Sequence, residues 1–403
     1  MTGEVSLSAA FNGVGPGSRI LAAPCCGAPV TLLRELGRHA GRTDGLELST
    51  GLMFGELPFG EAVRGGRLRY RTWHPPAEGR ALIREGLAEY LPLRASDVRR
   101  AVTGATDVLL LRVSPPDPDG WCSTGPSASF TRAAVDTARL VIAETDPDLP
   151  RTTGDSRVHV SEIDRRVAAE DPVSYYPGPS RADPRSETIA RYVTDLIPDG
   201  ATVQLGVGAV TETVGELLGK RGTASRIRFL GMLTEQMIAL ADASGEVALA
   251  VELMGGPALM EWADGNPRLE MASSDRVHDP AFLGRIDRFV SVNSAASVDL
   301  AGQAVSDTIG GRVVSGIGGS ADFFEGAHLS AGGLRILALT STTARGVPTI
   351  VPEHPAGAQV AIPQHSVDVV VTEHGVAWLR GRSVGERREA LLAIAGGNTG
   401  GAE

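Results

Sequence analysis

The stretch that decides the fold is Thr106–Val113, which reads TDVLLLRV. A continuous apolar run behind a polar lead-in is typical of a strand buried on both faces of a parallel sheet. The run leads into Ser114–Gly125, SPPDPDGWCSTG, a loop dense in Pro, Gly and Asp. Open α/β sheets place ligand-binding loops at the carboxyl ends of such strands. The two segments together predict an α/β domain with a functional loop at one sheet edge.

Strand and helix patterns alternate on both sides of this stretch, which indicates an α/β domain. The segment after the first expected strand contains Pro29, at a position that suits the start of a helix. The expected strands are Ser18–Ala23, 44–53 and 139–144, and the expected helices are the segment after Pro29, 79–90 and 130–138.

A polar segment rich in Pro, residues 171–187, separates two such patterns and is the expected domain boundary. We therefore expect an N-terminal α/β domain over 1–180 and a C-terminal α/β domain over 181–403. The second half predicts helices at 187–197, 209–218 and 383–395, strands at 201–206, 226–230, 247–253, 289–293, 336–340, 348–352 and 367–372, and a Gly-rich tail at 396–403.

Composition narrows the class of protein. The chain has 403 residues, 42% hydrophobic and 21% charged, which is ordinary for a globular protein. A net charge of -10 argues against nucleic acid as the main partner. Three cysteines form no disulfide framework, and no Cys/His spacing resembles a metal site. Neither a signal peptide nor a membrane span is expected, so we predict a cytoplasmic protein without a metal.

One charged segment stands out, Ser273–Pro280, which reads SSDRVHDP. It holds two carboxylates, an arginine and an imidazole in eight residues, between glycine-rich turns at Gly255-Gly256 and 316–319. Taken alone, such a segment is a solvated loop. Its surroundings make it a candidate active-site segment.

Several glycine motifs offer backbone amides to a ligand. Residues 206–208 (GVG) follow a strand and precede a helix, although a plain tight turn is the preferred interpretation. Residues 315–323 (SGIGGSADF) indicate backbone that approaches another group closely. His374, after another apolar strand, and Cys122 are candidate base and nucleophile, but a satisfied histidine and a buried thiol explain them better.

Six ordered runs resemble the acetyl-CoA hydrolase/transferase family, the class I CoA-transferases that include 4-hydroxybutyrate and acetate CoA-transferases. The runs are SPPDPDGWCSTG, PRTTGDSRVHVSEID, DGATVQLGVGAV, VSVNSAASVDLAGQ, SGIGGSADFFEGAHLS and VVVTEHGVAWLRGRS. They extend over about residues 20 to 395, nearly the whole chain.

The resemblance implies a two-domain class I CoA-transferase-like (NagB/RpiA/CoA-transferase-like) α/β fold with the active site in the interdomain cleft. It also implies a homodimer that uses coenzyme A as a thioester substrate. In the family, a glutamate attacks the acyl-CoA to form an acyl–glutamyl anhydride. The CoA thiolate then forms a glutamyl–CoA thioester, from which a carboxylate acceptor takes the CoA.

The same resemblance places the catalytic carboxylate at Asp275, five residues before Pro280, on the C-terminal domain. Asp275 is one methylene shorter than the usual glutamate, and His278 replaces the usual asparagine. Leu233 stands before Thr234-Glu235 where the family commonly has histidine. The residues expected to contact CoA are Glu252, Leu253, Met254, Gly255, Gly256, Gly318, Gly319, Ile350 and Gly375.

The functional expectation is transfer of CoA from a short-chain acyl-CoA to a carboxylate, with Asp275 as nucleophile and His278 assisting, since imidazole titrates near neutral pH. The alternative is an acyl-CoA hydrolase in which the shorter Asp275 acts on water as a general base. A further alternative is a repurposed acyl-CoA or acyl-carrier-protein acyltransferase, or a CoA-binding protein, in a biosynthetic pathway.

Overall fold

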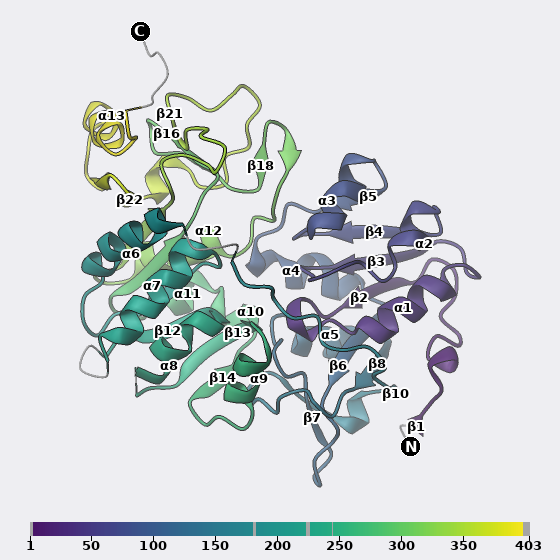
Figure 1. The fold of residues 1–403 in the computed structure, drawn as a ribbon. Helices are drawn as coiled ribbons and strands as arrows, with labels where there is room; N and C mark the ends of the chain where they lie inside the picture. Colours follow the sequence, from purple (N-terminus) through teal and green to yellow (C-terminus); the bar gives the residue numbers. More distant parts are fainter. Residues whose placement is uncertain (1–2, 180–182, 223–225, 244, 398–403) are drawn as a thin grey trace. The chain divides into compact units, whose positions relative to one another are not determined.

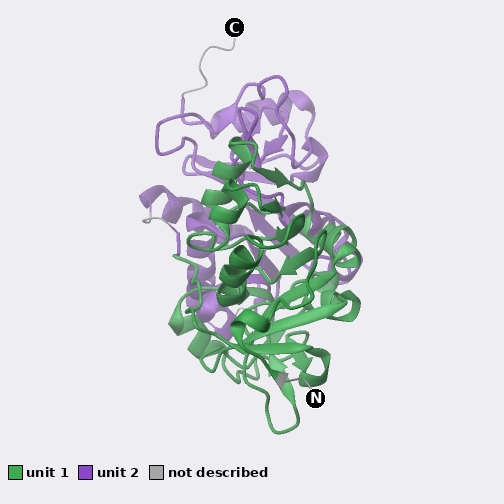
Figure 2. Cartoon of the chain, turned by 90° about the vertical axis from the view of Figure 1, so that its right-hand side faces the viewer, with its two compact units in different colours: residues 1–177, 249–277 green, residues 178–248, 278–403 purple. Residues whose placement is uncertain are grey.

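The chain forms two compact units in a computed structural model that describes residues 3–179, 183–222, 226–243 and 245–397 (Figure 1). Unit 1 comprises Met1–Pro177 and Leu249–Val277, and unit 2 comprises Gly178–Ala248 and His278–Glu403 (Figure 2). The expected division at residue 180 differs from these units, because residues 249–277 belong to unit 1 although they follow the first segment of unit 2 in sequence. Within the expected linker and tail, residues 180–182 and 398–403 lie outside the described residues.

Unit 1 is built on a parallel sheet whose strands run in the order β1-β10-β8-β6-β2-β3-β4-β5. All six residues of β6 are buried, which confirms the strand expected from the apolar run. The strands are β1 (Gly3–Glu4), β2 (Arg19–Ala22), β3 (Leu46–Thr50), β4 (Leu68–Thr72), β5 (Ala88–Tyr90), β6 (Val108–Val113), β8 (Leu140–Thr145) and β10 (Arg165–Ala168).

The sheet of unit 1 is buried on both faces. Ile20 and Val108 belong to one apolar cluster, whereas their sequence neighbours Leu21 and Leu109 belong to another. This follows from the alternation of side chains along a strand. The helices of unit 1 are α1 (Val30–His39), α2 (Gly60–Arg64), α3 (Ala77–Arg84), α4 (Ala95–Val102), α5 (Thr131–Thr137), α9 (Pro257–Ala263) and α10 (Ser274–Val277).

The helix expected over 79–90 is shorter than predicted. α3 ends at Arg84, and Gly86 takes a left-handed backbone conformation (φ +73°). Residues 88–90 then form β5 at the sheet edge, where Leu87 is 39% exposed. Apolar residues at helical spacing continue past Arg84, so Gly86 indicates the end of the helix better than the apolar spacing does.

A buried arginine holds the carboxyl half of this sheet together. Arg112 of β6 lies 3.0 Å from Glu144 and 2.7 Å from Asp146, with 1% of its side chain exposed. Its guanidinium also donates to the carbonyl of Asp171 at 2.7 Å. The pairing explains how a charged residue is tolerated inside an apolar strand.

The strands of unit 2 run in the order β12-β11-β15-β20-β22-β23, parallel except for the last pair. They are β11 (Thr202–Leu205), β12 (Arg228–Thr234), β15 (Phe289–Asn293), β20 (Leu334–Ala338), β22 (Val369–Thr372) and β23 (Gly375–Trp378). The helices are α6 (Pro184–Leu196), α7 (Ala209–Lys220), α8 (Ile238–Ala243), α11 (Pro280–Leu283), α12 (Ser320–Leu329) and α13 (Val384–Ala393).

The other described strands are mostly short, although β13 has seven residues. In unit 2, β16 (Ser297–Asp299) pairs with β17 (Ala304–Val305) and β21 (Ile350–Val351), and β18 (Thr308–Ile309) forms a hairpin with β19 (Arg312–Val313). The remaining strands are β7 (Trp121–Ser123), β9 (Arg157–His159), β13 (Ala248–Met254) and β14 (Leu269–Met271).

Candidate active site

Asp275 lies on the short helix α10 of unit 1. Its Oδ2 atom lies 3.1 Å from Nη1 of Arg99, and 41% of its side chain is exposed. Arg99 belongs to α4, which contacts α10. The carboxylate is therefore accessible to water but is already paired with a cation, and such a pairing reduces its tendency to attack an electrophile.

His278 is an interior residue of unit 2, with only 4% of its surface exposed. Its ring lies 4.7 Å, centroid to centroid, from that of Phe323. Within the described residues, its Nδ1 atom has no hydrogen-bond partner. Burial lowers the pKa of His278 to about 3. The expected titration near neutral pH is therefore wrong, because an apolar surrounding disfavours the imidazolium.

The glycine-rich turn before α12 packs against this histidine. A Cβ atom added to Gly319 would lie 2.5 Å from Cδ2 of His278 and 2.8 Å from Cε2 of Phe323, so a side chain there is sterically excluded. Gly318 has φ +65°, and an added Cβ would meet no atom within 4 Å. Packing therefore accounts for Gly319, whereas Gly318 has open space beside its backbone. CoA binding by this turn stays a prediction.

The expected CoA-binding strand end belongs to the interior of unit 1. Glu252, Leu253 and Met254 are all buried. The Glu252 carboxylate accepts a hydrogen bond from Ser127 Oγ at 2.8 Å. Burial raises the pKa of Glu252 to about 8, and the nearby hydroxyls of Ser129 and Ser127 offset part of that effect. Glu252 thus holds its proton near neutral pH.

The backbone after this strand is only partly accessible. Gly255 is buried, and its carbonyl accepts a weak hydrogen bond from Cys26 Sγ at 3.8 Å. Gly256 is half-buried. In unit 2, Ile350 is 1% exposed and belongs to an apolar cluster, while Gly375 is half-buried with φ +141°. Of these four residues, the two half-buried glycines have a backbone that a ligand could reach.

Cysteine nucleophiles are disfavoured by their surroundings. Cys25, Cys26 and Cys122 are all buried. Burial raises the pKa of each thiol, to about 11 for Cys26. The thiol rather than the reactive thiolate therefore predominates at neutral pH. This agrees with the interpretation of Cys122 as an ordinary buried thiol.

Glu235 was not selected from the sequence, and it stands at the carboxyl edge of the parallel sheet of unit 2. It directly follows β12 and begins the 3₁₀ turn Glu235–Met237, with an exposed side chain. β11 pairs in parallel with both β12 and β15, so the carboxyl ends of the three strands lie at the same sheet edge. Ligands of open parallel sheets bind outside that edge.

The same sheet edge carries a buried polar network. Ser291 Oγ donates to Gln204 Oε1 at 2.6 Å, and Asn293 Nδ2 donates to the same oxygen at 3.0 Å. The adjacent glycine turn leads into α7, but the Gly208 amide already donates to Glu212 Oε1 at 3.1 Å. That amide is therefore not available to a phosphate in this conformation.

Two kinds of feature are absent from the described part of the chain. Over residues 3–179, 183–222, 226–243 and 245–397, no group of three or more His, Cys, Asp or Glu side chains is arranged to hold a metal ion. No described helix has the length and apolar character needed to cross a bilayer.

Family profiles match both halves of the chain. Residues 5–177 match the acetyl-CoA hydrolase/transferase N-terminal domain, and residues 255–399 match the acetyl-CoA hydrolase/transferase C-terminal domain. The chain belongs to the acetyl-CoA hydrolase/transferase family. It is an enzyme of the acyl-CoA transferase or hydrolase class.

Curated relatives of this family align over most of the chain. The 4-hydroxybutyrate coenzyme A transferase of Clostridium kluyveri is 36% identical over 396 residues, covering 94% of this chain and 91% of that protein. The butyryl-CoA:acetate CoA-transferase of Anaerostipes caccae is 29% identical, covering 92% and 88%.

Solved structures confirm the fold class. RipA from Yersinia pestis superimposes with a TM-score of 0.89 at 27% identity, covering 97% of this chain and 93% of that chain. A 4-hydroxybutyrate CoA-transferase from Porphyromonas gingivalis superimposes with a TM-score of 0.75 at 27% identity, with the same coverage. The chain therefore has the α/β class I CoA-transferase fold.

A sequence signal for Glu235 was present. Residues 229–233 form an apolar run that ends in Thr234-Glu235, an acid placed directly after a buried strand. The family attacks its substrate with a glutamate, and Glu235 has the expected side-chain length where Asp275 does not. The segment Ser273–Pro280 stands out by its charged composition, whereas the sequence around Glu235 is that of an ordinary strand end.

Proposed function

We propose that this protein transfers CoA from a short-chain acyl-CoA thioester to a carboxylate acceptor. The family membership and the substrates named for the aligned relatives support the proposal. The structure contributes accessible carboxylates whose chemistry needs no metal. The observation that carries the mechanism is the exposed glutamate at the carboxyl end of β12.

The reaction we propose runs through two kinds of covalent intermediate. A carboxylate oxygen of the enzyme attacks the thioester carbonyl, the C–S bond breaks, and CoA leaves as a thiolate. The thiolate attacks the enzyme-side carbonyl of the resulting anhydride and releases the first carboxylate product. The acceptor carboxylate then attacks the enzyme–CoA thioester, which expels the thiolate and leaves a second anhydride. The thiolate attacks the acceptor-side carbonyl of that anhydride, which forms the new acyl-CoA and releases the enzyme carboxylate.

We assign the nucleophile to Glu235, and Asp275 is the competing assignment. Asp275 is held by Arg99 and is one methylene shorter than glutamate, while a misplacement of about 1 Å can cost roughly 10²-fold in rate. Glu235 has the full length of a glutamate side chain, so the reach that Asp275 lacks is present there. An exposed ion pair is worth only about 0–1 kcal/mol, so the pairing weakens the case for Asp275 but does not exclude it.

The experiment that tests this assignment follows free thiol with and without acetate as acceptor. Acetyl-, propionyl- and butyryl-CoA serve as donors. We expect acceptor-dependent transfer, lost on Glu235→Gln and retained on Asp275→Asn. The Glu→Gln change preserves shape, and Glu216→Gln, on an exposed helix face, is the matched control. Full activity in Glu235→Gln with loss in Asp275→Asn reverses the assignment.

Hydrolysis is the second candidate, because the 41% exposed Asp275 carboxylate is open to water and could act as a general base. Thiol release at the same rate with or without acceptor would favour it. Transfer only to an acyl carrier protein, or CoA binding without turnover, would support the repurposed alternatives.

We also propose that the protein acts in the cytoplasm as a homodimer. The resemblance to the family supports the dimer, and light scattering at micromolar concentration tests it. A monomeric mass would contradict this part of the proposal without affecting the chemistry.

A further inference from the structure

Asn12 and Gly13 form an exposed turn in unit 1, between the 3₁₀ turn Leu7–Ala9 and β2. Val14 N donates to the carbonyl oxygen of Phe11 at 3.0 Å. Gly13 takes φ +79°, whereas Asn12 does not have a positive φ, which is the pattern of a type II turn. An asparagine therefore stands directly before a glycine at a solvent-facing turn, where packing does not keep the two residues from reacting with each other.

Neither reacting group of this pair is held by a contact. Within the described residues, the Asn12 side-chain amide makes no hydrogen bond and the Gly13 N–H has no acceptor. A Cβ atom added to Gly13 would meet no atom within 4 Å. The Gly13 nitrogen can therefore approach the side-chain carbonyl carbon of Asn12 when the chain rotates about the Asn12 Cα–C bond. The rotation costs the hydrogen bond that closes the turn.

The sequence contains three other asparagines, and each lacks part of this arrangement. Asn266 precedes Pro267, whose nitrogen bears no hydrogen and is already fully substituted. Asn293 is 7% exposed, and its Nδ2 atom donates to Gln204 Oε1 at 3.0 Å, which holds the amide inside unit 2. Asn398 precedes a threonine, whose side chain hinders the approach of its nitrogen, and lies outside the described residues. Asn12 is the least hindered of the four.

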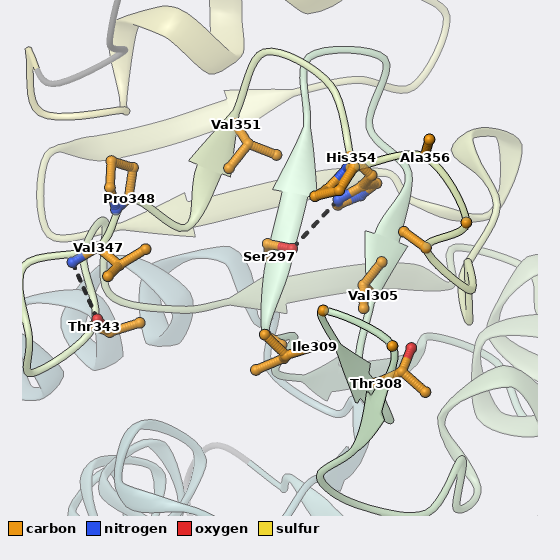
Figure 3. A pocket seen from close by; sticks show the side chains of 16 residues that line it. Ser297, Val305, Thr308, Ile309, Thr343, Val347, Pro348, Val351, His354 and Ala356 are labelled. Carbon is orange, nitrogen blue, oxygen red and sulfur yellow. Dashed lines mark hydrogen bonds between the residues drawn. The ribbon is translucent and has the colours of Figure 1, made fainter.

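Exposed glycine turns elsewhere lack the side chain that would react. The hairpin of β18 and β19 turns through Gly310 and Gly311 beside the pocket drawn in Figure 3, but the residue before them is Ile309, whose side chain has no carbonyl. Asp44 precedes Gly45 in another exposed turn. A carboxylate is a much poorer electrophile than a carboxamide because of its negative charge, so we expect Asn12 to react before Asp44.

We propose that Asn12 is a site of spontaneous deamidation, with water as the co-reactant and isoaspartate as the main product. Hydroxide removes the Gly13 N–H proton, and the nitrogen attacks Cγ of Asn12. The Cγ–Nδ2 bond breaks, and ammonia leaves with a proton taken from water. Water then opens the cyclic imide. Cleavage between Gly13 N and Cγ gives aspartate, and cleavage between Gly13 N and the main-chain carbonyl carbon gives isoaspartate. The reaction is independent of the CoA chemistry proposed above.

Both ends of this turn are anchored in the core of unit 1. Phe11 and Val14 are 2% and 5% exposed and belong to one apolar cluster. The carbonyl oxygen of Val14 lies 2.9 Å from Nε2 of His39, and the Phe11 ring stacks on the His39 ring with centroids 5.5 Å apart. Isoaspartate places an extra carbon in the main chain between these anchors and adds a negative charge. The turn must then change shape or lose an anchor, so we expect the modified protein to be less stable.

Ageing of the purified full chain in mildly alkaline buffer tests the site. The protein is digested under mildly acidic conditions, which suppress further deamidation, and isoaspartate is located by mass spectrometry after labelling with an L-isoaspartyl methyltransferase and S-adenosylmethionine. We expect the product on the peptide that contains Asn12 and none at Asn266, Asn293 or Asp44. More product at any of those three overturns the proposal. So does a rate at Asn12 more than roughly tenfold below that of a synthetic peptide of residues 8–17, because only protective structure would cause it.

Asn12→Gln is the matched variant, because it keeps the amide but would have to close a larger ring, which forms far more slowly. Thermal unfolding of fresh and aged samples is followed by circular dichroism. We expect the unfolding midpoint of aged wild type to fall in proportion to its isoaspartate content, while aged Asn12→Gln matches the fresh protein. An equal fall in both aged proteins, or no fall in wild type that carries isoaspartate at Asn12, overturns the weakening of the turn. Neither measurement requires turnover, so both are independent of the proposed function.

Discussion

The buried carboxyl group of Glu252 makes stability depend on pH in a direction opposite to that of an ordinary carboxylate. Its pKa is raised from 4.5 to about 8 by burial. Between these values the unfolded chain has lost the proton and the folded chain keeps it. Unfolding therefore releases a proton, and this group favours the folded state less and less as the pH rises. Glu252→Gln removes the titration and keeps the acceptor for Ser127.

The size of the effect follows from the shift. One pH unit within the window is worth about 1.4 kcal/mol, so the step from about pH 5.5 to about pH 7.5 corresponds to roughly 3 kcal/mol. We expect the free energy of unfolding of Glu252→Gln, relative to wild type, to increase by about that amount over the step. The residue is 4% exposed, so solvent screening reduces the figure little.

Guanidinium denaturation followed by circular dichroism at both pH values measures the difference. Glu216→Gln is the control, because Glu216 lies on an exposed helix face and pairs with Lys220 at 2.7 Å. The control should change stability by the same small amount at both pH values. A Glu252→Gln difference that stays constant within about 0.5 kcal/mol would refute the claim that Glu252 is protonated in the folded state.

Three further predictions concern packing and charge. Arg112→Met should destabilise unit 1 by about 3–5 kcal/mol in denaturant unfolding, because two buried carboxylates lose their partner. The control Arg132→Met, which breaks an exposed pair, should cost less than about 1 kcal/mol. Equal losses of stability in the two variants would contradict the buried network. Gly319→Ala should lower the free energy of unfolding by about 1–3 kcal/mol through overpacking against His278, and the double variant with His278→Ala should recover part of that loss. Purely additive effects of the two substitutions would argue against the contact. In nuclear magnetic resonance titrations from about pH 8 to about pH 5, the ring signals of His278 should stay constant because burial lowers its pKa to about 3, whereas a solvated histidine titrates near 6.5.

Local signals predicted the elements better than their assembly. The apolar run of β6 and the following loop were sufficient for a buried parallel strand, because a strand covered on both faces needs continuous apolar residues. The 79–90 helix was overextended, since helical spacing of apolar residues continued past Gly86 into an edge strand. The return of residues 249–277 to unit 1 depends on contacts that are distant in sequence, which no periodicity records.

The candidate site shows the same limit. Asp275 and His278 stand out in the sequence by charge, but charge alone shows neither that Asp275 pairs with an arginine nor that the His278 imidazole is buried. Arg99, which pairs with Asp275, is 176 positions away in sequence. The place of Glu235 at the carboxyl edge of the sheet follows only from the parallel pairing of β11 with β12 and β15, which the sequence does not record.

The nucleophile assignment is tested most directly by mass spectrometry of the enzyme after incubation with acetyl-CoA. Rapid quenching, proteolysis and peptide mapping locate the covalently bound CoA or its borohydride-reduced product. The account predicts the adduct on the peptide that contains Glu235, and no adduct in Glu235→Gln. An adduct on the peptide that contains Asp275, or CoA transfer with no adduct on either peptide, would contradict it.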